Sequence, residues 1–240
     1  MVTGKKHQFK SDLTMAYIDR KIIISNGYAL LSHLIKRLYT NNVDYIMRRD
    51  LTLPIKTMEL DSSLVLRELR MDDIPKLLES SFSNHNNAMV LDYLRLWHML
   101  KADIKTGYVA VGADDQPRHA CWLIDSKENM KLKKAFKGGL RPLRHDEVLF
   151  ERFHTIEKYR REGLQKWSIA KCVEKSREIQ AKWAFIYIRQ SNIFSLKAAS
   201  KNDFIPFMKK IDKWRLYQRQ FYYIEVGSEN KLDKQPKRKP

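Results

Sequence analysis

The chain has 240 residues, of which 46 are lysine or arginine and 28 are aspartate or glutamate, for a formal net charge of +18. Hydrophobic residues make up 43% of it, which excludes a disordered polybasic chain, because such chains lack the apolar residues of a core. Two cysteines, Cys121 and Cys172, exclude a disulfide scaffold. The charge favours an acidic partner without selecting among phosphorylated metabolites, nucleic acid, anionic lipid and acidic proteins.

No segment has the roughly 18 apolar residues that a membrane-spanning helix needs. The run Ile22-Ile23-Ile24 is too short for the apolar region of a signal peptide, which takes about 7–15 residues. We therefore expect a soluble, cytoplasmic protein without a membrane span.

The first elements in chain order are expected to be helical. Apolar residues fall at helical spacing over residues 27–38, and Asn41-Asn42 are expected to end that helix. A second short segment covers residues 43–47, and Pro54 then breaks the chain. We expect this part of the chain to form an N-terminal helical extension.

The middle of the chain changes from helical to strand-like patterns. Residues 63–69 alternate like a strand, and Asp72-Asp73 supply the N-cap of a helix that runs through Leu78. Residues 87–104 form one apolar stripe at helical spacing. Two short apolar runs on either side of a turn, 108–111 and 119–124, predict a hairpin.

The remaining elements alternate between strand and helix. Residues 126–146 are expected to form a basic connection with Gly138-Gly139 at its centre. The predicted elements after it are a strand over 147–154, a helix from 164 to about 180, a strand over 184–188, a short helix near 195–200 and a strand over 219–226. This order predicts an α/β or α+β fold, with helices packed on a single sheet.

The turn from Tyr159 to Gln165 lies between a predicted strand and a predicted helix. A helix N-terminus has unpaired amide N–H groups and about half a positive charge, so this turn is a natural phosphate site. Gly163 allows a ligand to approach the backbone closely, and Arg160 and Arg161 add charge. An ordinary turn with a surface arginine pair is the alternative interpretation.

Further motifs accompany this turn. The strand ending in Phe153-His154-Thr155 precedes Arg160-x-x-Gly163-x-Gln165, and a long helix and a strand lead to Asn192-x-x-Ser195 and Phe204. In this order the chain resembles the GNAT superfamily of acyl-CoA-dependent N-acyltransferases. The resemblance divides the chain into an N-terminal extension (1–62), an acyltransferase domain (63–226) and a basic tail (227–240), and it is strongest over residues 147–204.

The resemblance implies a mixed, mostly antiparallel sheet of six or seven strands with helices on both faces. The co-substrate acetyl-CoA is expected to lie where the strand ending at Thr155 separates from the strand at 184–188. The backbone of Phe153, His154 and Thr155 would bind its pantetheine arm, and Asn192 would face its distal end. The amides from Arg161 to Gln165 would hold the pyrophosphate, so the cofactor-binding turn comprises Arg160, Arg161, Glu162, Gly163, Leu164 and Gln165.

Three positions depart from the family pattern. Gln165 stands where Gly or Ala is usual, which loosens the contact with the pyrophosphate unless the side chain points outward. Ala199 stands where many members have a tyrosine that protonates the departing thiolate, and Asp203 replaces the Gly before Phe204. A non-catalytic interaction protein on the same fold is therefore an alternative.

Acyl transfer needs a group that takes the proton of the acceptor amine. Glu147 and Glu151 share one face of the predicted strand, and His154 faces the other. Relatives commonly place a carboxylate base on this strand, so Glu151 is the first candidate for the catalytic base and His154 the second. A salt bridge of Glu151 with Arg152 or Lys158 is the structural alternative.

The remaining candidates concern metals and nucleic acid. The seven histidines show no metal-binding spacing and have no cysteine partners, so we expect no metal. Residues 213–223 interleave basic and aromatic residues, as a nucleic-acid surface or an ordinary strand does. We expect an acetyltransferase that acts on a primary amine of an acidic or phosphorylated small molecule such as an amino sugar. A basic nucleic-acid-binding protein is the rival.

Overall fold

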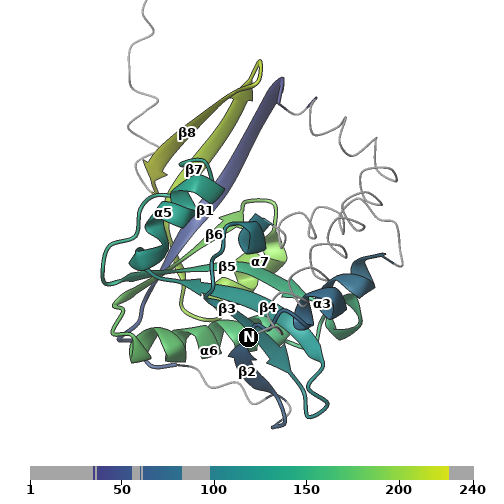
Figure 1. Cartoon of the computed structure of the whole chain (residues 1–240). Helices are drawn as coiled ribbons and strands as arrows, with labels where there is room; N and C mark the ends of the chain where they lie inside the picture. Colours follow the sequence, from purple (N-terminus) through teal and green to yellow (C-terminus); the bar gives the residue numbers. More distant parts are fainter. Residues whose placement is uncertain (1–34, 36, 56–59, 61, 83–97, 227–240) are drawn as a thin grey trace, which may run out of the picture.

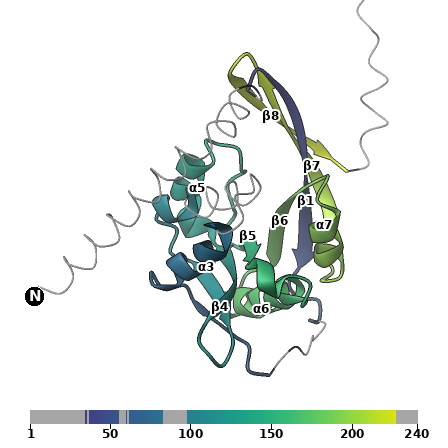
Figure 2. The same cartoon turned by 90° about the vertical axis from the view of Figure 1, so that its right-hand side faces the viewer.

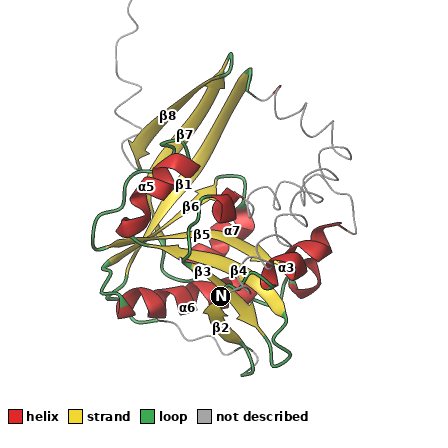
Figure 3. Ribbon diagram, in the orientation of Figure 1, coloured by secondary structure: helices red, strands yellow, loops and turns green. Residues whose placement is uncertain are grey.

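Eight strands and four α-helices make up the part of the chain that the computed structural model describes, residues 35, 37–55, 60, 62–82 and 98–226 (Figures 1 and 3). The strands are β1 (Tyr39–Asp50), β2 (Val65–Glu68), β3 (Gly107–Val111), β4 (Pro117–Ile124), β5 (Glu147–Thr155), β6 (Trp183–Arg189), β7 (Ile205–Arg215) and β8 (Gln218–Glu225). The helices are α3 (Asp73–Phe82), α5 (Asn129–Ala135), α6 (Leu164–Glu178) and α7 (Ile193–Ser200), with 3-10 turns at Ser126–Glu128 and Glu157–Tyr159.

All eight strands belong to one sheet in the order β2-β3-β4-β5-β6-β1-β7-β8. Among these strands, β5 and β6 pair in parallel and every other neighbouring pair is antiparallel. The expected mixed, mostly antiparallel sheet is therefore confirmed, with eight strands where six or seven were expected.

Two strands account for the difference. Residues 39–50, expected to hold the end of a helix at Asn41-Asn42 and a short segment, form β1 instead, an interior strand between β6 and β7. Strand β7 was not predicted either. Charged residues such as Asp44 on β1 and Lys210 on β7 point inward and pair with each other, so neither strand alternates between apolar and polar residues.

The expected basic connection is also partly helical. Asp125 caps the first turn by accepting a hydrogen bond from the Lys127 amide at 2.9 Å, and α5 follows directly. Leu132 and Ala135 of α5 are buried against the sheet. The sequence analysis identified no helix in the basic connection 126–146, whereas its first ten residues form a 3-10 turn and α5.

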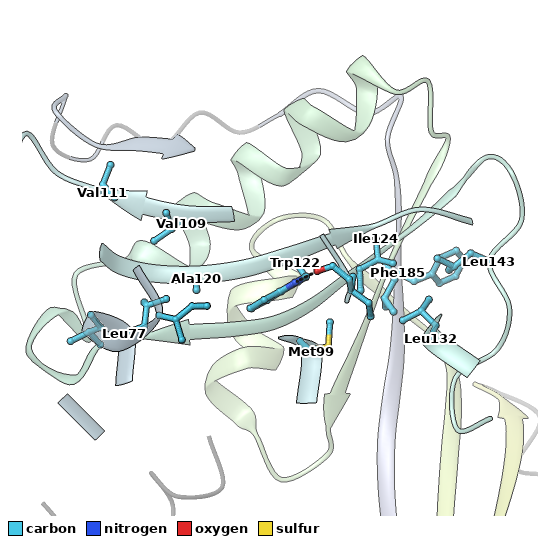
Figure 4. Packing of buried hydrophobic residues seen from close by; sticks show 14 of the residues in the cluster. Leu77, Met99, Val109, Val111, Ala120, Trp122, Ile124, Leu132, Leu143 and Phe185 are labelled. Atoms are coloured by element: carbon cyan, nitrogen blue, oxygen red, sulfur yellow. Dashed lines mark hydrogen bonds between the residues drawn. The ribbon is translucent and has the colours of Figure 1, made fainter. Parts of the chain in front are cut away.

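The two faces of the sheet carry separate cores. On the face covered by α3 and α5, called here the α5 face, one apolar cluster includes Trp122, Ile124, Phe185 and Leu132 (Figure 4). On the opposite face, the α6 face, residues such as Phe150, Val173 and Phe204 pack under α6 and α7. Figure 2 shows the helices on the two sides, and β1, β7 and β8 extending beyond them as an arm.

Some expectations lie outside the described residues: most of the helix at 27–38, most of the apolar stripe at 87–104, and the tail 227–240. The other predicted helices and strands between residues 63 and 226 are found close to their expected positions. In the described ranges, no helix has the length and apolarity to cross a membrane.

Candidate active site

The sheet opens where β5 and β6 part. Their parallel pairing runs from Glu147 opposite Trp183 to Phe150 opposite Ile186, and both strands continue beyond the last pair. A cavity of about 1450 Å³ is lined by residues of both strands past this point. It reaches both faces of the sheet, because Ile188 belongs to the core of the α6 face and Tyr187 packs against the core of the α5 face.

A β-bulge changes which side chains of β5 face the cavity. Arg152 has a φ of 57°, and the register with β4 shifts there, so that Glu151 lies opposite Trp122 and His154 lies opposite Ala120. Trp122 and Ala120 both lie in the core of the α5 face. The bulge therefore turns Glu151 and His154 to the same face, which corrects the expectation from simple alternation that they face opposite sides.

Glu151 lines the cavity, and its side chain is 12% exposed. Burial raises the pKa of this carboxyl above its ordinary value, and the positive charge of Arg152 opposes the shift. The expected structural alternative is present, since Arg152 Nε lies 3.5 Å from Glu151 Oε1. A carboxylate with a raised pKa inside a cavity is suited to take up a proton.

The second half of the sheet presents charged residues to the same cavity. Arg189 Nε of β6 lies 2.7 Å from Asp44 Oδ1 of β1, and Lys210 Nζ of β7 lies 3.9 Å from Asp44 Oδ2. Further along, Arg219 of β8 holds both carboxylate oxygens of Asp212, at 3.0 and 2.8 Å. This wall of the cavity is therefore built from ion pairs that connect neighbouring strands.

The turn before α6 has the geometry of an anion site. Arg161 and Gly163 have φ angles of 73° and 84°, and Gly163 is the N-cap of α6. The first backbone bond of the helix is donated by the Trp167 amide to Gly163 O. Among the described residues, no acceptor reaches the amides of residues 161–166, so these donors are available to an anionic ligand.

The side chains near this turn partly close it. Gln165 Nε2 donates to Ser195 Oγ at 3.2 Å, so the side chain crosses toward α7 and lines the cavity instead of pointing outward. Asn192 Oδ1 caps α7 by accepting from the Ser195 amide at 3.1 Å. Arg160 Nε donates to Thr155 O at 3.3 Å, which ties the turn to the end of β5.

The other two departures from the family pattern have structural roles. Ala199 is fully buried in the core of the α6 face. Asp203 has a φ of 60°, a conformation that glycine adopts without strain, and its Oδ2 lies 2.9 Å from Arg49 Nη1 of β1. Asp203 therefore keeps the left-handed backbone and adds an ion pair that holds the N-terminal strand.

Four of the predicted site residues line the cavity, namely Glu151, Phe153, Gln165 and Asn192. His154, Thr155 and the turn from Arg160 to Leu164 lie beside it in sequence and do not line it. This placement favours Glu151 over His154 as the base. Sequence reasoning missed most of the other lining residues, including Asp44, Tyr187, Arg189, Lys210, Asp212 and Arg219.

Tyr187 is the most informative of the missed residues. It follows Ile186, the last paired residue of β6, so it lies at the start of the opening, as Glu151 does on β5. Burial raises the pKa of its phenol, and its hydroxyl, although near the Arg141 backbone, makes no well-formed hydrogen bond to any described residue.

The described residues contain no cluster of three or more His, Cys, Asp or Glu arranged to hold a metal ion.

No protein-family model and no curated protein sequence matches this chain. Solved structures do match, with 8–16% identity. One is the GCN5-related glucosamine N-acetyltransferase region of a fungal multi-domain GH3 β-N-acetylglucosaminidase, with a TM-score of 0.52 and 11% identity over 76% of this chain and 22% of that one. A GCN5-related N-acetyltransferase from Sphaerobacter thermophilus has a TM-score of 0.48 and 10% identity, and the match covers 82% of this chain and 57% of that one. A GNAT acetyltransferase from Colwellia psychrerythraea has a TM-score of 0.48 and 8% identity, and the match covers 74% of this chain and 57% of that one.

The fungal match shows that this chain has the fold of the GCN5-related N-acetyltransferases, and the resemblance found in the sequence is confirmed at that level. This chain spans about a fifth of the length of the fungal protein and little more than half of the two bacterial ones. At 11% identity the likeness establishes the fold, and the activity has to be argued from the site.

Proposed function

We propose that the protein is an acetyltransferase that moves an acetyl group from acetyl-CoA to a primary amine. The observation that carries this proposal is the cavity through the sheet, which has unpaired helix amides near one end and the buried carboxylate of Glu151 within it. Acetyl-CoA supplies an activated acetyl group, and an amine that has lost its proton displaces the CoA thiol.

The residues of the turn are assigned to the phosphates of CoA. The free amides of residues 161–166 donate to the pyrophosphate, and Arg160 and Arg161 add positive charge. The edge of β5 from Phe153 to Thr155 is assigned to the pantetheine arm, because β6 no longer pairs with it there. Gln165 and Asn192 line the path between these two regions.

Glu151 is assigned the role of base. Its raised pKa lets it hold a proton taken from the acceptor amine, directly or through one water molecule. Tyr187 is assigned to donate a proton to the departing thiolate, since Ala199 cannot and since the phenol of Tyr187 remains protonated inside the cavity. His154 stays the second candidate for the base.

The acceptor is proposed to be acidic. The cavity is lined by five basic side chains, from Arg37, Arg152, Arg189, Lys210 and Arg219, against the three carboxylates of Asp44, Glu151 and Asp212. An amino sugar phosphate has both the amine and the negative charge. The fungal structure with a similar fold is a glucosamine N-acetyltransferase region, which supports amino sugars as the first acceptors to test.

Binding of acetyl-CoA tests the cofactor assignment. Calorimetry with the full chain should show one site, and the thermal midpoint should rise with acetyl-CoA concentration. Reversal of charge in Arg161→Glu should weaken binding more than the same reversal in Lys171→Glu, which changes a half-buried lysine of α6 that does not line the cavity. Absence of binding to the unmodified protein would contradict the enzyme proposal.

Release of free thiol in the presence of an amine panel tests the reaction. Turnover with an amino sugar supports acetyl transfer, whereas tight cofactor binding with no turnover on any amine supports the non-catalytic alternative. The nucleic-acid alternative predicts that generic oligonucleotides bind with an affinity that falls steeply with salt. No salt-dependent binding would exclude that alternative.

A further inference from the structure

Lys210 is a buried cation inside the cavity. It lies on β7, its side chain is 8% exposed, and its side chain lines the opening between β5 and β6. Its ammonium has three donors, yet among the described residues no atom accepts a hydrogen bond from it, and the nearest carboxylate oxygen, Asp44 Oδ2, is 3.9 Å away.

The carboxylates around Lys210 are already engaged by arginines. Asp44 is held by Arg189 at 2.7 Å, and Asp212 accepts two hydrogen bonds from Arg219. The ammonium also lies 4.8 Å from the ring centre of Phe221 and 5.8 Å from that of Tyr187. The local structure therefore compensates the charge of Lys210 in part and leaves its donors unfilled.

A buried ammonium without acceptors is costly, because it has lost the hydration that it had in water. Burial indeed lowers the pKa of Lys210, and Asp44 and Asp212 act in the opposite direction. An anion that enters the cavity would supply the missing acceptors and counter-charge together. Charge-assisted hydrogen bonds of this kind are among the stronger contacts a protein can make.

The position of Lys210 also fits a two-point acceptor. Glu151 and Lys210 line the same cavity from opposite halves of the sheet, and their charges influence each other. An acceptor with an amine at one end and an anion at the other can meet both residues at once. The amine end of the acceptor then meets the carboxyl of Glu151, and the anionic end meets the ammonium of Lys210.

We propose that Lys210 Nζ binds a carboxylate or phosphate group of the acceptor, and that the acceptor is therefore an amine that also carries an anion. This inference rests on the proposed acetyltransferase function. It assigns Lys210 to substrate binding and specificity, with no part in proton transfer.

The test uses two matched pairs of probes with the full chain and acetyl-CoA. Glucosamine 6-phosphate is compared with glucosamine, and 4-aminobutyrate is compared with 4-aminobutyramide. The proposal expects the anionic member of at least one pair to have a kcat/KM at least tenfold higher, and the pair that responds tells phosphate from carboxylate. Equal use of both members in both pairs would overturn it, and this comparison needs no variant.

Variants locate the effect. Lys210→Met should raise the KM of the preferred anionic probe about tenfold or more, with kcat and the neutral probe nearly unchanged, and Lys210→Arg should recover part of the loss. Lys213→Met, on the opposite face of β7, is the control and should behave like the unmodified protein. Equal slowing of anionic and neutral probes by Lys210→Met would overturn the proposal.

Failure of the proposed function would be recognised separately. If no amine is acetylated, calorimetry with glucosamine 6-phosphate and 4-aminobutyrate still measures anion binding. Binding that weakens about tenfold in Lys210→Met supports the anion site without the reaction. No binding, or equal binding by both proteins, overturns it.

Discussion

The two halves of the sheet on either side of the opening differ in how they bury polar groups. In the half formed by β2 to β5, an apolar cluster surrounds Trp122, and burial lowers the pKa of the imidazole of His119. The buried carboxylates of this half, Glu147 of β5 and Asp73 of α3, are each held by an arginine, Arg141 and Arg67, and do not line the cavity. In the half formed by β6, β1, β7 and β8, Arg49, Lys210 and Asp212 are buried as charged groups. Glu151 lies at the boundary between the halves.

The difference teaches what each half contributes. The first half provides a buried scaffold for the bulge that directs Glu151 into the cavity. The second half provides fixed charges along the other wall, held in place by cross-strand ion pairs. Under the proposed function, acetyl transfer and acceptor selection depend on different halves, and variants in each half should separate the two properties.

The largest expected effect is on catalysis. Glu151→Gln should lower kcat by about 10²–10⁴-fold, because general-base catalysis contributes a factor of this order. The rate of the unmodified protein should rise with pH through the raised pKa of Glu151. Steady-state kinetics over a pH series measure both.

A matched control lies on the same strand and face. Glu147→Gln removes a carboxylate that Arg141 holds at 2.7 Å and that does not line the cavity. It should change stability and leave kcat within a few-fold. Glu151→Gln should also raise the thermal midpoint at neutral pH, because it removes a buried carboxylate whose ionised form is disfavoured. Full activity of Glu151→Gln would shift the role of base to His154.

The next effect concerns the stability of the second half. Arg49 is 2% exposed and donates to Asp203 Oδ2 and Pro54 O, both at 2.9 Å, and to the Asn202 carbonyl. Arg49→Ala leaves these acceptors and the Asp203 charge without a partner, so the free energy of unfolding should fall by about 3–5 kcal/mol. Denaturant titration gives this value.

The control is an exposed ion pair of the first half. Arg70 is 62% exposed and lies 3.2 Å from Asp115, so Arg70→Ala should cost at most about 1 kcal/mol. Equal losses in the two variants would mean that the buried pair does not anchor β1. In that case the contrast between the halves would not extend to stability.

A smaller effect distinguishes the first half by its pH dependence. Burial, and then the nearby charge of His154, lowers the pKa of His119 from 6.5 to about 3. Between pH 6.5 and about pH 3, the unfolded chain binds a proton at His119 that the folded protein does not bind. The contribution of neutral His119 to the free energy of unfolding is therefore complete above pH 6.5 and is lost as the pH falls. The slope is at most about 1.4 kcal/mol per pH unit.

Replacement of the imidazole should flatten this slope. His119→Gln should show a weaker loss of stability between pH 6 and pH 4 than the unmodified protein, measured by denaturant titration at each pH. His145→Gln, at an exposed histidine, should leave the slope unchanged. An unchanged slope in His119→Gln would mean that another group controls the acid response.

The smallest effect separates two roles of Asn192. Its side chain caps α7, so Asn192→Ala should lower the free energy of unfolding by about 1 kcal/mol. Asn192→Ser keeps a capping oxygen and should recover most of this loss. If Asn192 contacts the cofactor, the affinity for acetyl-CoA falls in both variants. If Asn192 only caps α7, the affinity falls in Asn192→Ala and is largely recovered, together with the stability, in Asn192→Ser.

Apart from α5, the strands and helices described between residues 63 and 200 were predicted from the sequence, because their patterns are local. The hairpin at β3 and β4, the long helix α6 and the strands β5 and β6 each show a clear period. Strands β1 and β7 could not be found in this way, since Asp44 and Lys210 face inward and the charges near them come from residues far away in the sequence. Tertiary ion pairs override the local pattern there.

The site was predicted in part for the same reason. The turn before α6 and Glu151 are recognisable from sequence because residue type and spacing are specific there. The facing of His154 was predicted wrongly, because a bulge at Arg152 depends on the register with β4. The charged wall is built from the four strands β1, β6, β7 and β8, and no single motif in the sequence contains its residues.

The place of β1 in the sheet also sets the order in which the protein can fold. Strands β7 and β8 reach the rest of the sheet through β1, and Ile46 of β1 pairs with Tyr187 of β6 far along the chain. This contact closes a very long loop, which is slow because its entropic cost is met before any pairing is gained. During synthesis, β1 precedes β6 and cannot pair with it until residues 183–189 have been made. A fragment that starts at residue 63 lacks the strand on which its own C-terminal hairpin must dock.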